Sequence, residues 1–213
     1  MNVIIYDTPP GIPSFIASLL RAARHRVSRT TDPEDAKLKI STTLFDALVL
    51  GPSGAPRELA DFIEAEFSDL PIILAGVPVE VPAAGQVAAV LPAPLCAERM
   101  AAAFRRLDYR RRERLSKLPV ALADEGVSIS CRMADLVEDT MVLAGESDEF
   151  QRYFGGGPRR VKASVLGVPL DGEVSRADRG EFQRVRRVDV RLEPASAKEL
   201  ASRLRREAAA IPA

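Results

Sequence analysis

The stretch FDALVLG, residues 45–51, decides the fold class, because it is a short apolar run that ends at glycine and proline. Runs of this length without polar alternation are typical of strands that are buried on both faces of a parallel sheet. Three runs of the same kind surround it: NVIIYD at 2–7, LPIIL at 70–74 and QVAAVLPAP at 86–94. A shorter strand around residues 25–29 completes a set of five.

Helical patterns separate these strands. Apolar residues recur at helical spacing in residues 12–24, 56–67 and 95–107, with charged residues on the opposite sides. Asp32 stands before Pro33, which predicts a helix N-terminus with an aspartate cap. Strands that alternate with helices predict βαβ units, and we therefore expect residues 1–107 to form an α/β flavodoxin-like domain with a five-stranded parallel sheet.

The pattern changes after Leu107. Residues 108–114 are densely charged and are predicted to form a basic linker. In residues 115–213, short apolar runs alternate with polar residues at period two, as half-buried antiparallel strands do. Asp171-Gly172 is a hairpin signal, and Ser196 is the expected cap of a last helix over residues 196–209. The sequence thus predicts a small, mainly-β barrel domain with a C-terminal helix.

Composition excludes several classes of function. The 30 basic and 30 acidic residues give a net charge of zero, so no global field favours nucleic acid or anionic membrane. Six arginines in residues 105–114 leave a nucleic-acid-binding regulator as an alternative, although tryptophan is absent and aromatic residues are few. Two cysteines form neither a disulfide framework nor a zinc site. With no leader-like N-terminus and no apolar run long enough to span a membrane, we expect a cytoplasmic protein.

Residues 1–107 resemble the receiver domain of two-component response regulators. The resemblance rests on the order of FDALVLGPSG, LPIILAG and VLPAPL, which look like the last three receiver strands. It implies an acidic pair for Mg²⁺ after the first strand, an acceptor aspartate, a hydroxyl residue and a lysine. In this chain those positions are occupied by Asp7 with Thr8, and by Gly51, Gly76 and Ala93.

Glycine carries no nucleophile, so the acceptor position at Gly51 cannot take a phosphoryl group. Asp46 is a poor substitute, because it would lie at the start of its strand, away from the edge where such sheets bind ligands. The proline-broken segment 77–85 replaces the usual fourth helix. We interpret the altered face as a fixed, phosphorylation-independent interface, with a loop of no consequence as the alternative.

Residues 108–195 resemble PilZ, the bacterial cyclic-di-GMP receptor module. Arg110 and Arg114 have the spacing of its RxxxR motif, and Asp135 begins a segment like its second motif. That resemblance implies a cyclic-di-GMP site on these three residues. Val137 and Thr140 replace the serine and glycine of the second motif. The motif is therefore incomplete, and we do not expect the site to bind the nucleotide.

No catalytic residue, cofactor or metal ligand is predicted. The single histidine, His25, lies between two arginines with no nucleophile signature near it, and the glycines at 155–157 lack the residues of a phosphate-binding loop.

The prediction is a non-enzymatic signalling adaptor that acts by contact with proteins of bacterial signalling or motility machinery, with homodimerisation possible in principle. A cyclic-di-GMP receptor that uses Arg110 and Arg114 is a further alternative.

Overall fold

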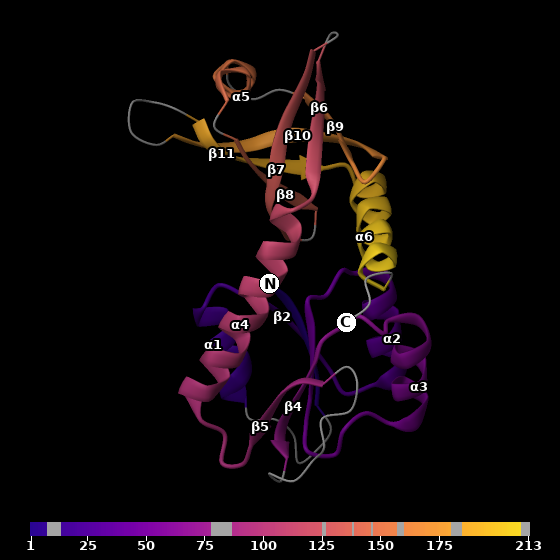
Figure 1. The fold of residues 1–213 in the computed structure, drawn as a ribbon. Coiled ribbons are helices and arrows are strands. Elements are labelled where there is room, and N and C mark those ends of the chain that lie inside the picture. The colour runs from indigo at the N-terminus through magenta and orange to yellow at the C-terminus, as the bar shows by residue number, and fades with distance from the viewer. Residues whose placement is uncertain are drawn as a thin grey trace. The chain divides into compact units, whose positions relative to one another are not determined.

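The computed structural model describes residues 1–7, 14–77, 87–124, 127–137, 139–145, 147–156, 160–179 and 185–209. The chain divides into two compact units, one over Met1–Asp108 and the other over Tyr109–Glu207. Figure 1 shows the elements of both units. They are called here the N-terminal unit and the C-terminal unit.

The N-terminal unit contains a five-stranded parallel sheet with the strand order β2-β1-β3-β4-β5. Its strands are β1 (Asn2–Tyr6), β2 (Arg26–Thr30), β3 (Ala47–Leu50), β4 (Ile72–Val77) and β5 (Val87–Pro92). This order is that of flavodoxin-like, doubly wound folds, which include the receivers. The predicted α/β fold class is therefore confirmed.

Successive residues of a strand point to opposite faces of the sheet, and helices cover both faces. The helices are α1 (Ser14–Ala22), α2 (Pro33–Thr42), α3 (Arg57–Glu66) and α4 (Ala97–Ser116), whose residues from Tyr109 onward belong to the C-terminal unit. One buried cluster joins strand residues such as Val3 and Ile5 to α1 and α4. The other joins Ile4 and Leu48 to α2 and α3. The runs at β1 and β3 thus form strands that are buried on both faces, as predicted, whereas in β5 only Leu91 is fully buried.

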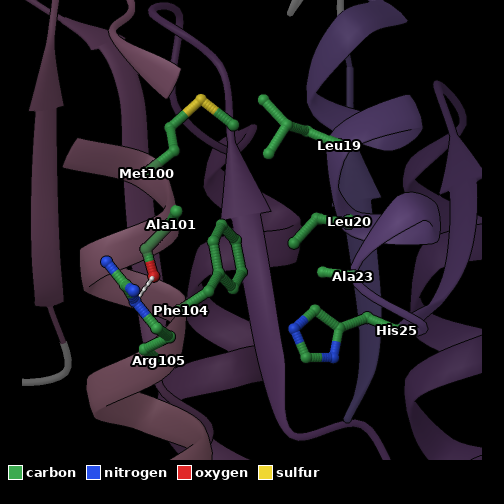
Figure 2. A pocket seen from close by; sticks show the side chains of 8 residues that line it. All are labelled: Leu19, Leu20, Ala23, His25, Met100, Ala101, Phe104 and Arg105. Atoms are coloured by element: carbon green, nitrogen blue, oxygen red, sulfur yellow. Dashed lines mark hydrogen bonds between the residues drawn. The ribbon is translucent and has the colours of Figure 1, made fainter. Parts of the chain in front are cut away.

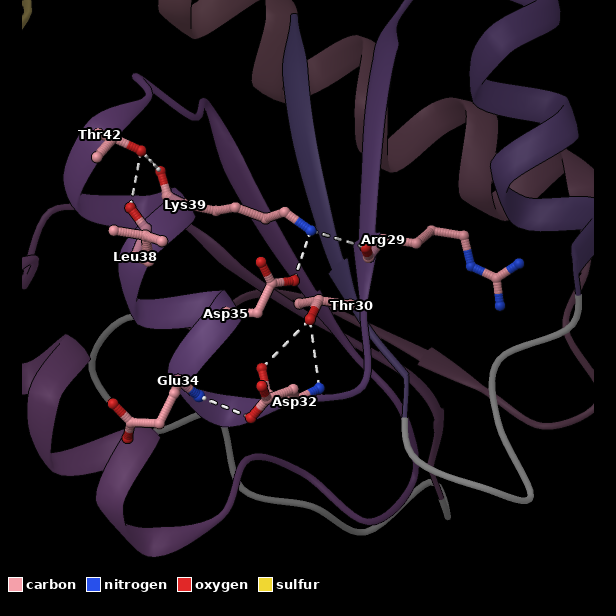
Figure 3. Close-up of polar contacts among 8 residues, drawn as sticks. All are labelled: Arg29, Thr30, Asp32, Glu34, Asp35, Leu38, Lys39 and Thr42. Carbon is pink, nitrogen blue, oxygen red and sulfur yellow. Dashed lines mark hydrogen bonds and ion pairs between the residues drawn. The ribbon is translucent and has the colours of Figure 1, made fainter.

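Polar contacts fix the start of α2 (Figure 3). Asp32 caps the helix, and its Oδ1 accepts a hydrogen bond from the backbone N–H of Glu34 over 3.1 Å. Lys39 donates to Asp35 over 2.5 Å and to the backbone carbonyl of Arg29 over 3.2 Å. The helix start predicted from Asp32-Pro33 is therefore confirmed, and α2 is tied to the end of β2.

The basic segment at residues 108–114 is helical and lies inside α4, which continues to Ser116. The segment contains no glycine or proline, and four of its seven residues are arginine, a good helix former. Phe104, Arg111 and Leu115 are buried at helical spacing along α4.

The C-terminal unit is a closed antiparallel barrel with the strand order β10-β11-β8-β7-β6-β9. Its strands are β6 (Pro119–Asp124), β7 (Val127–Val137), β8 (Thr140–Ala144), β9 (Arg160–Val165), β10 (Val168–Arg179) and β11 (Val185–Leu192). A short helix, α5 (Asp148–Phe154), and the last helix, α6 (Pro194–Ala209), complete it. The predicted barrel with a C-terminal helix is confirmed.

Two details of this unit differ from the prediction. Asp171-Gly172 lies inside β10, and the β9–β10 turn is formed by Leu166 and Gly167, with φ angles of 52° and 77°. Ser196 does not cap α6, because the helix already begins at Pro194. The Ser196 hydroxyl instead accepts a hydrogen bond from the backbone N–H of Asp171 over 3.0 Å, which joins α6 to β10.

Candidate functional site

The receiver-like positions lie at the carboxyl edge of the sheet in the N-terminal unit. Asp7 follows β1, Gly51 follows β3, Gly76 is the last residue but one of β4, and Ala93 follows β5. These four strands are neighbours in the sheet. Ligands of flavodoxin-like folds bind at this edge, so the chain brings the four positions together where a receiver holds its chemistry. Thr8 lies outside the described residues.

Asp7 is the one acidic residue among these positions, and a guanidinium of the same chain neutralises it. Nη2 of Arg29 donates to Oδ2 of Asp7, whose side chain is 8% exposed. The backbone N–H of Asp7 donates to the carbonyl of Thr30 over 2.9 Å. A carboxylate that carries an internal cation is a weaker ligand for Mg²⁺, which prefers free carboxylate oxygens.

Gly51 and Gly76 occupy the acceptor and hydroxyl positions at this edge, so neither position has a functional side chain. Gly51 is buried, and its carbonyl accepts a hydrogen bond from the N–H of Gly54 over 2.9 Å in a tight turn. Gly76 has a φ of +74°, a left-handed conformation that side chains with a Cβ rarely adopt. Its nearest neighbour for an added Cβ is Pro52, at 3.8 Å. The backbone conformation at Gly76 therefore favours glycine, which has no hydroxyl to contact a phosphoryl oxygen.

Asp46 has a structural role at the opposite end of its strand. It precedes β3, and its Oδ2 accepts a hydrogen bond from the backbone N–H of Asn2 over 2.6 Å. Its position therefore agrees with the expectation that it does not replace the acceptor aspartate. Among the residues that the structure describes, no three His, Cys, Asp or Glu side chains lie close enough together to hold a metal ion.

The three residues of the expected nucleotide site differ in exposure. Arg110 and Arg114 are exposed on α4, whereas Asp135 is buried on β7. The arginine that meets Asp135 is Arg111, which is 8% exposed. Sequence reasoning missed Arg111, although its phase on α4 relative to the buried Phe104 and Leu115 marks it as the inward-facing arginine.

Asp135 is held by several groups of its own unit. Nη1 of Arg111 donates to its Oδ1 over 2.6 Å, and the N–H of Leu136 donates to the same oxygen over 2.8 Å. Nη2 of Arg111 also donates to the carbonyl of Leu136, and Nη2 of Arg112 lies 3.7 Å from Oδ2 of Asp135. The ladder between β7 and β8 is irregular between Met133 and Asp135, which lets the carboxylate turn toward α4.

The net effect of these contacts is to lower the pKa of Asp135. Burial alone would raise that pKa, but the charge and hydrogen bond of Arg111, the charge of Arg112 and the Leu136 N–H together outweigh burial. Asp135 is therefore a charged, internally satisfied residue of the barrel. The guanine of a ligand would have to displace Arg111 to reach it.

Val137 and Thr140 face each other where β7 turns into β8. The Thr140 hydroxyl donates to Asp139 over 3.0 Å, and Val137 is half-buried and offers no polar atom from its side chain. The hairpin therefore lacks the serine hydroxyl and the bare glycine backbone that the PilZ resemblance implies for ligand contact.

No helix in the described ranges is both long and apolar enough to cross a membrane.

No protein-family model and no curated protein matches the sequence. The receiver domain of a sensor histidine kinase from Pseudomonas aeruginosa PAO1 matches with a TM-score of 0.41 and 16% identity, over 50% of this chain and 95% of that one. The chemotaxis response regulator CheY4 of Vibrio cholerae matches with a TM-score of 0.41 and 17% identity, over 50% and 96%. NtrX from Brucella abortus matches with a TM-score of 0.44 and 18% identity, over 53% and 27%.

Structural neighbours of the N-terminal half include receiver domains, and the likeness is one of fold alone. The receiver-like fold rests on the strand order of the N-terminal unit, and the closed barrel with its last helix is consistent with the PilZ resemblance.

Proposed function

We propose that this chain is a non-enzymatic signalling adaptor, which works by binding proteins and uses neither phosphorylation nor cyclic-di-GMP. The observation that carries the proposal is Gly51, a residue without a side chain at the position where a receiver has its nucleophile. Without that nucleophile, the receiver-like unit cannot be switched by phosphorylation. It keeps its surfaces for protein contact.

A second observation supports the same proposal in each unit. The carboxylate that the resemblances assign to a ligand is paired with an arginine of the chain: Asp7 with Arg29, and Asp135 with Arg111. Buried charges need such partners, because an unpaired charge away from water is costly. A carboxylate that is already paired with an arginine of the chain gains little from binding Mg²⁺ or a dinucleotide.

The biological setting that we propose is control of motility or cell polarity in the bacterial cytoplasm. This part rests on the receiver and PilZ resemblances alone. Nucleic acid is not a proposed partner, since the chain as a whole is neutral.

Two measurements on the full chain test the proposal. Incubation with acetyl phosphate and Mg²⁺ should add no phosphoryl group, as judged by intact-mass spectrometry, with an ordinary receiver as the positive control. Isothermal titration with cyclic-di-GMP should give no binding heat. Phosphoryl uptake would contradict the adaptor proposal, and nucleotide binding that is lost in Arg110→Ala and Arg114→Ala would favour the cyclic-di-GMP receptor instead.

A further inference from the structure

A small apolar pocket lies between α1 and α4, and Figure 2 shows the side chains that line it. Its volume is about 70 Å³, whereas sites for nucleotides and other small molecules span roughly 300–1,000 Å³. Met100 and Phe104, which line the pocket, are only 1% and 2% exposed. The pocket is therefore a packing gap between two helices on one face of the sheet. Because helices cover both faces, another chain can reach the backbone of this sheet at its outer strands, β2 and β5.

Backbone hydrogen bonds at both ends of β2 show which of its groups face the neighbouring strand β1. The N–H of Arg26 donates to the carbonyl of Met1 over 3.0 Å, and the carbonyl of Thr30 accepts from the residue after β1 over 2.9 Å. Backbone groups alternate in direction along a strand, so the N–H and C=O groups of Val27 and Arg29 face outward. Among the residues that the structure describes, no strand pairs with this outer side of β2.

The side chain of Lys39 reaches one of these outward groups from α2, as Figure 3 shows. Its Nζ donates to the carbonyl of Arg29 over 3.2 Å and to Oδ2 of Asp35 over 2.5 Å. The hydrogen bond from Lys39 is the largest of the effects that lower the pKa of Asp35, so this carboxylate is charged at neutral pH and holds the ammonium in place. A strand that paired with β2 would need the carbonyl oxygen that Lys39 contacts.

The two outer strands of the sheet differ in their own sequences. β5 ends at Pro92, which has no N–H to donate to an added strand. β2 contains no proline, and its outward residues Val27 and Arg29 each carry both a donor and an acceptor. Natural proteins commonly protect outer strands against pairing with proline or with lysine. In β2 the protection comes from Lys39 of the following helix, because the strand has no proline of its own.

We propose that Lys39, held by Asp35, blocks the addition of a second copy of this chain to the outer side of β2. A second copy carries the same outer strand, so two copies could pair antiparallel about a two-fold axis. Such pairing would gain hydrogen bonds at Val27 but would have to expel the ammonium from the carbonyl of Arg29 or bury it there, and burying a charge is costly. This role of Lys39 is independent of the adaptor function.

The test compares the full natural chain with Lys39→Met, which removes the ammonium and keeps a long side chain. In sedimentation velocity, Lys39→Met should self-associate at concentrations where the natural chain does not. Hydrogen exchange measured by NMR then locates the contact. The amides of Val27 and Arg29 should exchange at least about tenfold more slowly in the associated variant than in the natural chain, because they donate to the added strand.

Lys37→Met is the matched control. Lys37 lies on the same helix and also pairs with a carboxylate, since its Nζ donates to Glu34 over 2.7 Å, but this contact is within α2 and not with β2. The control should match the natural chain in both measurements. Asp35→Asn leaves the ammonium and removes the charge that holds it, so it should promote self-association in the same direction as Lys39→Met and to a smaller extent.

Three outcomes would overturn the proposal. In the first, Lys39→Met stays as monomeric as the natural chain, with unchanged exchange at Val27 and Arg29. In the second, Lys37→Met associates equally, which would assign the effect to lost charge on α2 in general. In the third, the natural chain itself associates with slow exchange at Val27 and Arg29, which would make this side of β2 an interface. Circular dichroism and urea unfolding check the fold of each variant, and if Lys39→Met does not fold, Asp35→Asn decides by the same two measurements.

Discussion

Nη1 of Arg111 lies 2.6 Å from Oδ1 of Asp135, and the two side chains, at 7% and 11% exposure, form a buried ion pair between α4 and β7. The neighbouring arginines that match the RxxxR motif are exposed. The barrel therefore uses the middle arginine of the run for its own structure and leaves the motif residues at the surface.

Removing one partner of this pair should destabilise the C-terminal unit strongly. Asp135→Ala leaves the Arg111 cation buried without its counter-charge, which typically lowers the free energy of unfolding by about 3–5 kcal/mol. Arg110→Ala, at an exposed position, should change it by less than about 0.5 kcal/mol. Urea unfolding measures both. Equal effects of the two substitutions would show that the ion pair does not support the fold, whereas Arg111→Met/Asp135→Leu should recover much of the loss.

The same pair predicts a pH dependence of stability. Because the folded state lowers the pKa of Asp135, the unfolded state binds the proton first as the pH falls. The stabilisation is therefore complete above the unfolded pKa of about 3.9 and is lost as the pH falls below it toward the folded pKa. Unfolding free energies measured from neutral pH down to pH 3 should fall more steeply for the natural chain than for Asp135→Asn. Parallel curves would contradict the assignment.

Gly172 is required by close packing and not by a turn. A Cβ at this position would lie 2.6 Å from the carbonyl oxygen of Arg191 and 2.9 Å from a methyl carbon of Val190, both on β11. Gly172→Ala should therefore lower the free energy of unfolding by about 1–3 kcal/mol, as overpacking does. Gly156→Ala is the control, since no atom lies within 4 Å of its added Cβ. Comparable stability of the two variants would show that β10 and β11 separate easily.

The two cysteines should differ sharply in reactivity. Burial raises the pKa of the Cys131 thiol to about 12, so at pH 8 almost none of it is the reactive thiolate, whereas Cys96 is exposed. Ellman's reagent should titrate one thiol in the folded protein and two in urea. In Cys96→Ser, the folded protein should show no fast reaction; a fast phase there would mean that β7 opens readily.

Restoring the acceptor residue alone should not restore phosphorylation. Gly51→Asp supplies a nucleophile, but Asp7 remains paired with Arg29 and Gly76 supplies no hydroxyl. Acetyl phosphate with Mg²⁺ should therefore add no mass to Gly51→Asp, whereas a receiver with its full set of residues serves as the positive control. A mass increase of one phosphoryl group would show that the pairing of Asp7 with Arg29 is easily opened by the metal.

The fold was largely predictable because its signals are local. Apolar runs such as FDALVLG gave the strands of the sheet, and Asp32-Pro33 gave the start of α2. Helix α5 was missed because seven residues are too few to show a periodicity, although the Ser147 cap followed by two acidic residues was a usable signal. Its buried aromatic residues, Phe150, Tyr153 and Phe154, pack on one another.

The site was less predictable, because it depends on which way a helix faces. In RRRER any of several arginines can be chosen, and only the phase set by Phe104 and Leu115 selects Arg111. That phase becomes visible when residues 108–114 are read as a continuation of α4. The pairing of Asp7 with Arg29 depends on β1 lying beside β2, with Ile5 opposite Arg29, which is a property of the assembled sheet and not of any local pattern.

The closure of the barrel by the β9–β10 and β6–β9 pairings decides how this unit can recognise another chain. An open sheet offers a row of unpaired N–H and C=O groups, to which a peptide can add as an extra strand. The described strands of a closed barrel offer no such row, so we expect a partner of the C-terminal unit to be selected by side chains. Such rows remain at the edges of the five-stranded sheet, where β2 and β5 each have one neighbour.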